Sequence, residues 1–160
     1  MVKENFFHGQ RDFRVDAKGR LPFPPNWLPQ MELRYGESLI IARGLSQDER
    51  YLEVFSPEAW NKQVARIRES LPEGKMKSSF VRWYVSTAET LELDAQNRIR
   101  LPKSLIEWAG IKKDISLLGA LDTIQIWSHE IMSETEQFDP QELDAVFDLF
   151  NIKKGSEESE

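Results

Sequence analysis

The stretch Val15-Asp-Ala-Lys-Gly-Arg-Leu-Pro-Phe-Pro24 recurs 78 residues later as Leu93-Asp-Ala-Gln-Asn-Arg-Ile-Arg-Leu-Pro102. Asp, Ala, Arg and the final Pro coincide in the two copies. Similar apolar runs follow each copy, at 39–44 and 51–56 in the first and at 115–119 and 123–128 in the second. A sequence repeat indicates a fold that is built from repeated structural units. We therefore expect one strand-rich unit that is present twice.

A tight turn is expected at the centre of each copy. Asp16 can accept hydrogen bonds from amides of its own turn, and Gly19 can adopt a positive φ without steric cost. Asn97 stands where the second copy would need that glycine, and Asn is the next best residue for a left-handed backbone. We therefore predict that Asp16 with Gly19, and Asp94 with Asn97, form the two turns.

Regular elements are expected around the turns. The runs 39–43 with 51–55, and 115–119 with 123–127, alternate as paired strands do. Residues 103–109 are typical of a short helix ended by Gly110, whereas the proline-rich equivalent 24–29 allows barely one turn. Ser56 and Pro57 can start a helix whose apolar stripe is Trp60, Val64, Ile67 and Leu71. A second helix carries Met76 and Phe80, and Asp139 can cap a last one with Leu143, Val146, Phe147 and Phe150 on one face.

These elements predict an α+β protein with four segments. Two repeated units occupy residues 10–56 and 88–131. A helical hairpin links them at 57–87, and 132–160 form a C-terminal helix with an acidic tail, of which residues 153–160 are expected to be disordered. Neither unit has enough residues to bury a good core alone, so we expect intimate packing between the two.

Composition narrows the class of function. The absence of cysteine excludes disulfides, thiolate metal sites and a cysteine nucleophile, and the only histidines, His8 and His129, lie far apart in sequence. No apolar run approaches the ~18 residues of a membrane span, and the charged start lacks the apolar core of a signal peptide. We therefore expect a soluble cytoplasmic protein without metal or cofactor.

Charge is distributed unevenly along the chain. The net charge is −6 at pH 7. Ten acids and two lysines from residue 130 onward give −8, which leaves +2 for residues 1–129. Because local charge matters more than the total, a mildly basic body with an acidic tail is compatible with nucleic-acid binding.

The doubled Asp-x-x-x-Arg turn with its downstream proline resembles the MraZ family, which is built from two SpoVT-AbrB-type units. The opening Phe6-Phe-His-Gly9 and the pair Ile126-Trp127 also match, so that the resemblance runs from about residue 6 to 132. It implies a duplicated SpoVT-AbrB-like double-split β-barrel with a helical hairpin between the copies. It further implies ring-like homo-oligomers, octamers or dodecamers, whose turns face double-stranded promoter DNA. Members bind repeated elements upstream of a cell-division and cell-wall gene cluster, within the nucleoid.

By position, the family's DNA-contacting arginines fall on Arg20 and Arg98. A guanidinium on a tight turn can bind a phosphate or a guanine edge. A plain ion pair with Asp16 or Asp94 is the alternative, and the two interpretations are compatible. Neighbouring cations support the contact: Arg11, Arg14 and Lys18 precede Arg20, and Arg100 and Lys103 follow Arg98. The second copy departs from the family pattern at Gln96 and Asn97, so the prediction of a DNA contact depends more on Arg20.

Two other functions deserve comparison. Asp16 and Asp94 could form a proton-sharing dyad of an aspartic protease, but such a dyad needs a hydroxyl residue and glycine after each Asp. Here alanine follows, and an arginine four residues on opposes proton sharing, so we do not expect an enzyme. The second alternative is a ring-forming scaffold with weakened DNA binding, which the low net charge and the changes at Gln96 and Asn97 would favour.

Overall fold

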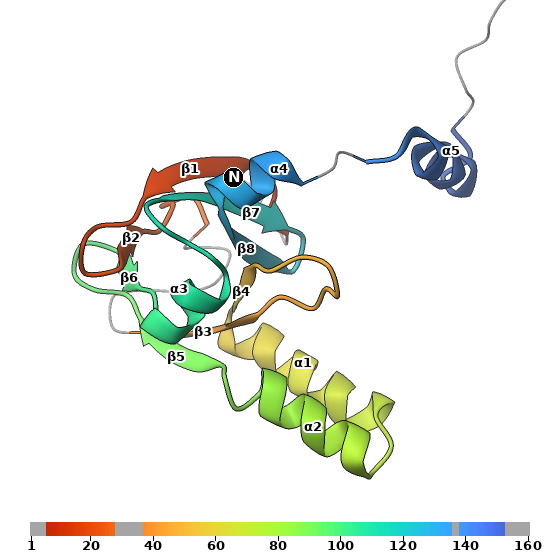
Figure 1. Cartoon of the computed structure of the whole chain (residues 1–160), viewed down its shortest axis with the longest axis horizontal. Helices are drawn as coiled ribbons and strands as arrows, with labels where there is room; N and C mark the ends of the chain where they lie inside the picture. The colour runs from red at the N-terminus through yellow and green to blue at the C-terminus, as the bar shows by residue number, and fades with distance from the viewer. Residues whose placement is uncertain (1–5, 28–36, 136–137, 153–160) are drawn as a thin grey trace, which may run out of the picture.

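The computed structural model describes residues 6–27, 37–135 and 138–152. Its helices and strands alternate in no regular βα pattern, which is the α+β class predicted. The strands are β1 (Gln10–Arg14), β2 (Arg20–Pro22), β3 (Ser38–Arg43), β4 (Leu52–Phe55), β5 (Glu89–Glu92), β6 (Arg98–Arg100), β7 (Asp114–Ala120) and β8 (Thr123–Ser128). The helices are α1 (Pro57–Ser70), α2 (Lys75–Tyr84), α3 (Lys103–Trp108), α4 (His129–Glu134) and α5 (Pro140–Leu149). Figure 1 shows a body of strands from which the α1–α2 hairpin projects.

One antiparallel sheet holds six strands in the order β1-β7-β8-β4-β3-β5, and β2 pairs with β6 in a separate ribbon. The hairpins β3–β4 and β7–β8 confirm the two predicted from the alternating runs. Strands of the two repeats are interleaved, because β1 pairs with β7 and β5 pairs with β3. The strand order therefore reads the same from either end when β5 to β8 are matched with β1 to β4. The repeats share one sheet, in which each gives an edge strand to the other.

The main core lies on the inner face of this sheet. Alternate residues point inward, and those fully buried are Leu39, Ile41, Leu52, Val54, Ile115, Leu117, Ile124 and Ile126. Two matching residues also enter this core, Trp27 at 2% exposure and Leu105 at 1%. Leu105 comes from α3, which confirms the predicted helix up to residue 108, and Gly110 follows with φ 68°. Of the expected turn at 24–29, residues 25–27 form a turn in which the Trp27 amide donates to the Pro24 carbonyl at 3.0 Å, and residues 28 and 29 lie outside the described residues.

A second core joins the helical hairpin to the outer face of β3 and β4. Ser56 caps α1 as predicted, with its Oγ accepting from the Ala59 amide at 3.1 Å. Ala42, Phe55, Ile67 and Tyr84 are buried together there. Trp60 and Leu71 of the expected α1 stripe pack against this cluster, so the stripe serves as core. The hairpin is therefore anchored to the first hairpin of strands.

The C-terminal helices are attached less tightly. Ser128 caps α4 as Ser56 caps α1, and α4 packs against β7 and β8. Asp139 caps α5 by accepting from the Gln141 amide at 2.9 Å, and no residue of α5 is buried. Figure 1 shows α5 standing apart from the strands, beyond α4. The stretch 153–160 lies outside the described residues. Among the helices that the structure describes, none combines the length and apolarity that crossing a membrane requires.

Candidate nucleic-acid interface

The two predicted turns are joined by the β2–β6 ribbon. Leu21 lies opposite Ile99 at its centre, and both side chains are fully buried. Because the ribbon is antiparallel, each turn lies next to the end of the other repeat's strand. The Leu101 amide donates to the Gly19 carbonyl at 2.8 Å, and the Phe23 amide donates to the Asn97 carbonyl at 3.0 Å. Each turn is thus fixed by backbone hydrogen bonds from the opposite repeat.

The first turn is organised by one carboxylate. Asp16 Oδ1 accepts from the backbone amides of Lys18 and Arg20, both at 2.9 Å. Its Oδ2 accepts from Arg20 Nε at 2.6 Å. Gly19 has a φ of 76°, in the left-handed region that favours glycine. A single carboxylate therefore sets the course of the backbone and holds one edge of the Arg20 guanidinium.

The second turn repeats these bonds despite its sequence changes. Asp94 Oδ1 accepts from the amides of Gln96 and Arg98 at 2.9 Å, and Oδ2 accepts from Arg98 Nε at 2.9 Å. Asn97 adopts a φ of 57° where the first repeat has Gly19. The bond at position 96 comes from the backbone amide, so replacing Lys by Gln leaves it in place. The two turns have the same conformation and differ in charge.

The hydrogen bonds alter the acidity of both aspartates. The backbone amide of Arg20, helped by the Arg20 side chain and the Lys18 amide, lowers the pKa of Asp16 to about 2 against the opposing effect of desolvation. The pKa of Asp94 is lowered for the same reasons, with the Arg98 amide as the largest cause. Both carboxylates are therefore charged at neutral pH, and each is engaged by its own arginine. A dyad that shares one proton would need the two carboxylates to face each other instead.

The two arginines keep donors for a ligand. Their side chains are 32% and 26% exposed, for Arg20 and Arg98 respectively. Each uses Nε for its aspartate, and within the described residues the remaining guanidinium nitrogens have no hydrogen-bond partner. A guanidinium held at one edge presents its other N–H groups in a fixed direction. Each arginine can therefore keep its ion pair with the aspartate while its other N–H groups bind an external ligand.

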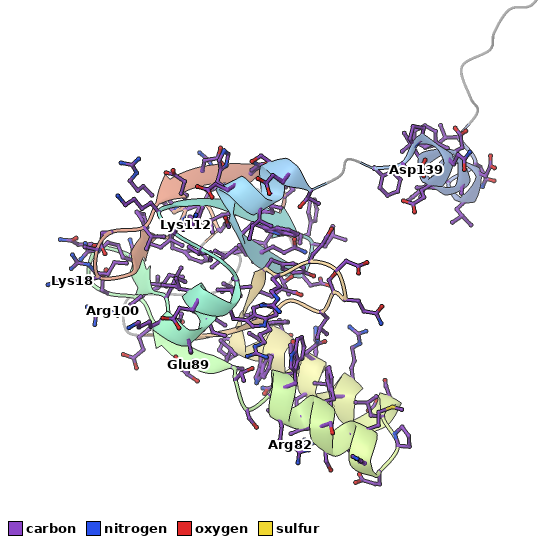
Figure 2. The ribbon with its side chains drawn as sticks, viewed as in Figure 1. Lys18, Arg82, Glu89, Arg100, Lys112 and Asp139 are labelled. Carbon is purple, nitrogen blue, oxygen red and sulfur yellow. The ribbon has the colours of Figure 1, made fainter. Side chains whose placement is uncertain are left out.

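Further cations gather beside the first turn. Lys18, Arg100 and Lys103 line an open hollow of about 790 Å³ that also borders β5. Figure 2 shows Lys18 and Arg100 projecting at the same end of the molecule, with Glu89 on the neighbouring β5. Arg14 is not among the residues lining the hollow, because it lies on β1 and forms an ion pair with Asp114 at 3.4 Å. The structure thus groups three of the predicted cations with the first turn, and Arg98 belongs to the other end of the ribbon.

Two acidic residues of this region were not predicted from the sequence as part of the site. Glu89 and Glu92 lie on β5 and line the same hollow as the three cations. Their positions follow those of Arg11 and Arg14 by 78 residues, so the second repeat carries acids where the first carries arginines. Extending the comparison of the repeats upstream of the turns would have revealed the reversal. The edge strands of the two repeats therefore differ in sign of charge.

Comparison with known proteins identifies the chain's relatives. The sequence model of the family described as "MraZ protein, putative antitoxin-like" matches residues 6–78 and 85–145. The chain belongs to the MraZ family. A MraZ protein of Syntrophobacter fumaroxidans, named "Transcriptional regulator MraZ", is 34% identical over 123 residues, which cover 77% of this chain and 79% of that protein. The identically named protein of Acetivibrio thermocellus is 34% identical over 76% of this chain and 80% of its own length. That of Bacteroides thetaiotaomicron is 29% identical over 89% and 90%.

Proposed function

We propose that this chain is a sequence-specific, DNA-binding transcriptional regulator. The observation that carries the proposal is the pair of turns in which an aspartate holds one edge of a partly exposed arginine. The relatives named as transcriptional regulators support it. In this proposal the fold is a duplicated SpoVT-AbrB-like double-split β-barrel, with units at 10–56 and 88–131, and the protein acts in the cytoplasm on nucleoid DNA without a cofactor.

The proposed contacts fall into two groups. Arg20 and Arg98 read base edges or bind phosphates, because a guanidinium can donate two parallel hydrogen bonds to either. Lys18, Arg100, Lys103 and Arg14 bind phosphates and position the protein. One protomer offers few such contacts, so useful affinity needs several protomers on repeated sites. A ring-like homo-oligomer on repeated promoter elements of a cell-division and cell-wall gene cluster meets that need.

The decisive variant is Arg20→Ala. We expect specific binding to weaken about ten-fold or more, because a lost guanidinium contact costs about 1–3 kcal/mol. Binding is measured by mobility shift across a salt titration, while light scattering checks that the oligomer keeps its mass. Arg68→Ala, on the last turn of α1, removes the same charge away from the ribbon and serves as the control. Equal binding by Arg20→Ala and the wild type would refute the proposal.

A second function is favoured by specific observations. Gln96 lacks the charge of Lys18, and Glu89 and Glu92 border the basic hollow. These features fit a ring-forming interaction protein with weakened DNA binding. Selection from random DNA separates the two functions. Enrichment of a spaced repeat supports the regulator, and no enrichment supports the scaffold.

A further inference from the structure

A cluster of two arginines and two tryptophans lies away from the turns. Arg43, at the end of β3, has its guanidinium carbon 5.3 Å from the ring centroid of Trp83 and 4.9 Å from that of Trp108. Arg50 approaches the Trp108 ring to 5.6 Å. The two rings meet edge to face, with centroids 6.0 Å apart. We call these four residues the arginine–tryptophan patch.

This patch lacks an anion. Neither arginine forms an ion pair with any carboxylate that the structure describes, and Arg43 Nε is buried without a hydrogen-bond partner. Burial, and then the positive charge of Arg50, lower the pKa of Arg43. Stacking on tryptophan offsets part of the cost of two nearby cations, but an unpaired buried donor remains unfavourable. Trp83 is 36% exposed and Arg50 is exposed, so the patch is accessible. A carboxylate on an apolar surface would pair with the arginines, and the apolar surface would cover the tryptophan rings.

Helix α5 has the complementary character. Residues 138–152 contain four acids and no basic residue. Leu143, Val146, Phe147 and Phe150 share one face, which Glu142 borders on one side and Asp144, followed by Asp148, borders on the other. Leu143 is 39% exposed and Phe150 71%, and no residue of α5 is buried. An apolar stripe of this size is normally covered, so α5 has the composition of a helix that docks on another surface.

The arrangement of the chain favours a second copy as the partner. The linker 135–139 between α4 and α5 spans at most about 18 Å when fully extended. In Figure 1 α5 extends beyond α4 and away from the body, and it stands apart from α3, which carries Trp108. We propose that α5 of one copy docks on the arginine–tryptophan patch of a second copy. Its apolar stripe covers Trp83 and Trp108, and its flanking carboxylates pair with Arg43 and Arg50.

The proposed contact is heterologous, because the helix of one copy meets a different surface on the next. Such contacts build closed rings or open chains. The inference rests on the homo-oligomer of the proposed function and supplies an interface for it. It makes no use of the DNA-contacting turns, so either can fail without the other.

The test uses full-length chains and their mass by light scattering without DNA. A patch variant carries Arg43→Gln with Arg50→Glu, and a helix variant carries Phe147→Ser with Phe150→Ser. Each alone should fall to the monomer. Mixed in equal amounts they should form a dimer, because the intact helix of the patch variant still fits the intact patch of the helix variant. Arg68→Glu and Ala145→Ser are the controls, since both residues are exposed and Ala145 lies on the face of α5 opposite the apolar stripe, and they should keep the wild-type mass.

Three outcomes would overturn the inference: a monomeric wild type, wild-type mass in either variant, or a mixture that stays monomeric. Arg50→Glu alone, at an exposed position, should already reduce the mass, which guards against misfolding caused by the partly buried Arg43. Wild-type mass in the patch variant together with DNA binding that depends on Arg20 would remove this interface and leave the regulator proposal intact.

Discussion

At the scale of single residues, the Asp–Arg pairs give the turns their character. Asp16 accepts three hydrogen bonds from the turn that follows it, two from backbone amides and one from Arg20 Nε. The arginine is therefore oriented before any ligand arrives, and less side-chain freedom is lost on binding. A lysine at position 20 could not reproduce this, because its single ammonium lacks separate edges for the aspartate and the ligand.

The acidity of Asp16 provides a direct test of that geometry. We expect its carboxyl group to titrate near pH 2 in NMR spectra, well below the ordinary value of about 3.9. A lowered folded-state pKa contributes stability that is fully present above the unfolded value. That contribution is lost as the pH falls from about 4 toward 2. Asp16→Asn should remove this part of the acid sensitivity. A titration midpoint near 3.9 in the wild type would show that the three hydrogen bonds do not form in solution.

At the scale of elements, the left-handed position of each turn explains how different residues support one conformation. Gly19 has a φ of 76°, and a Cβ there would lie 3.2 Å from the Leu101 carbonyl oxygen. Asn97 occupies the matching position with a Cβ, at a φ of 57°. Asn tolerates this region because its short polar side chain can hydrogen-bond locally, whereas Ala cannot.

We therefore expect Gly19→Ala to lower the free energy of unfolding by about 1–2 kcal/mol. Gly19→Asn should lower the free energy of unfolding by clearly less than Gly19→Ala does. In the second turn Asn97→Gly should be close to neutral and Asn97→Ala destabilising. Chemical denaturation of the four variants measures these differences. Equal losses for Ala and Asn at position 19 would mean that contact with Leu101, and not the backbone conformation, limits the turn.

Local elements were the part of the fold that the sequence could predict. Ser56 with Pro57 marks the start of α1, and alternating runs mark the two strand hairpins, because these patterns act through neighbours in the chain. The order of strands could not be predicted. A period of two tells which face of a strand is buried but not which strand lies beside it. The patch was equally hidden, since residues 43, 83 and 108 meet only through the tertiary fold.

At the scale of the whole molecule, the repeats are alike in backbone and unlike in charge. In the interleaved sheet and in the β2–β6 ribbon, equivalent strands of the two repeats are related by one approximate two-fold axis. Arg11 and Arg14 of β1 nevertheless correspond to Glu89 and Glu92 of β5. A DNA duplex on the ribbon would therefore meet unequal electrostatic surroundings. The hollow beside Lys18 combines cations from the ribbon and α3 with acids from β5.

The proposed DNA-binding role makes this asymmetry measurable. Replacing the acids by the charge of the first repeat, Glu89→Arg with Glu92→Arg, should tighten DNA binding, because two repulsive charges beside Lys18 become attractive. Each new phosphate contact should also steepen the dependence of log K on log salt by about 0.9. Glu69→Arg with Glu134→Arg changes the net charge equally on exposed positions of α1 and α4 and serves as the control. If both pairs tightened binding equally, net charge alone would govern affinity and DNA would not lie over β5. If Glu89→Arg with Glu92→Arg tightened binding more than the control pair, DNA would lie beside the hollow. The acids of the second repeat would then weaken DNA binding at a surface whose backbone matches that of the first repeat.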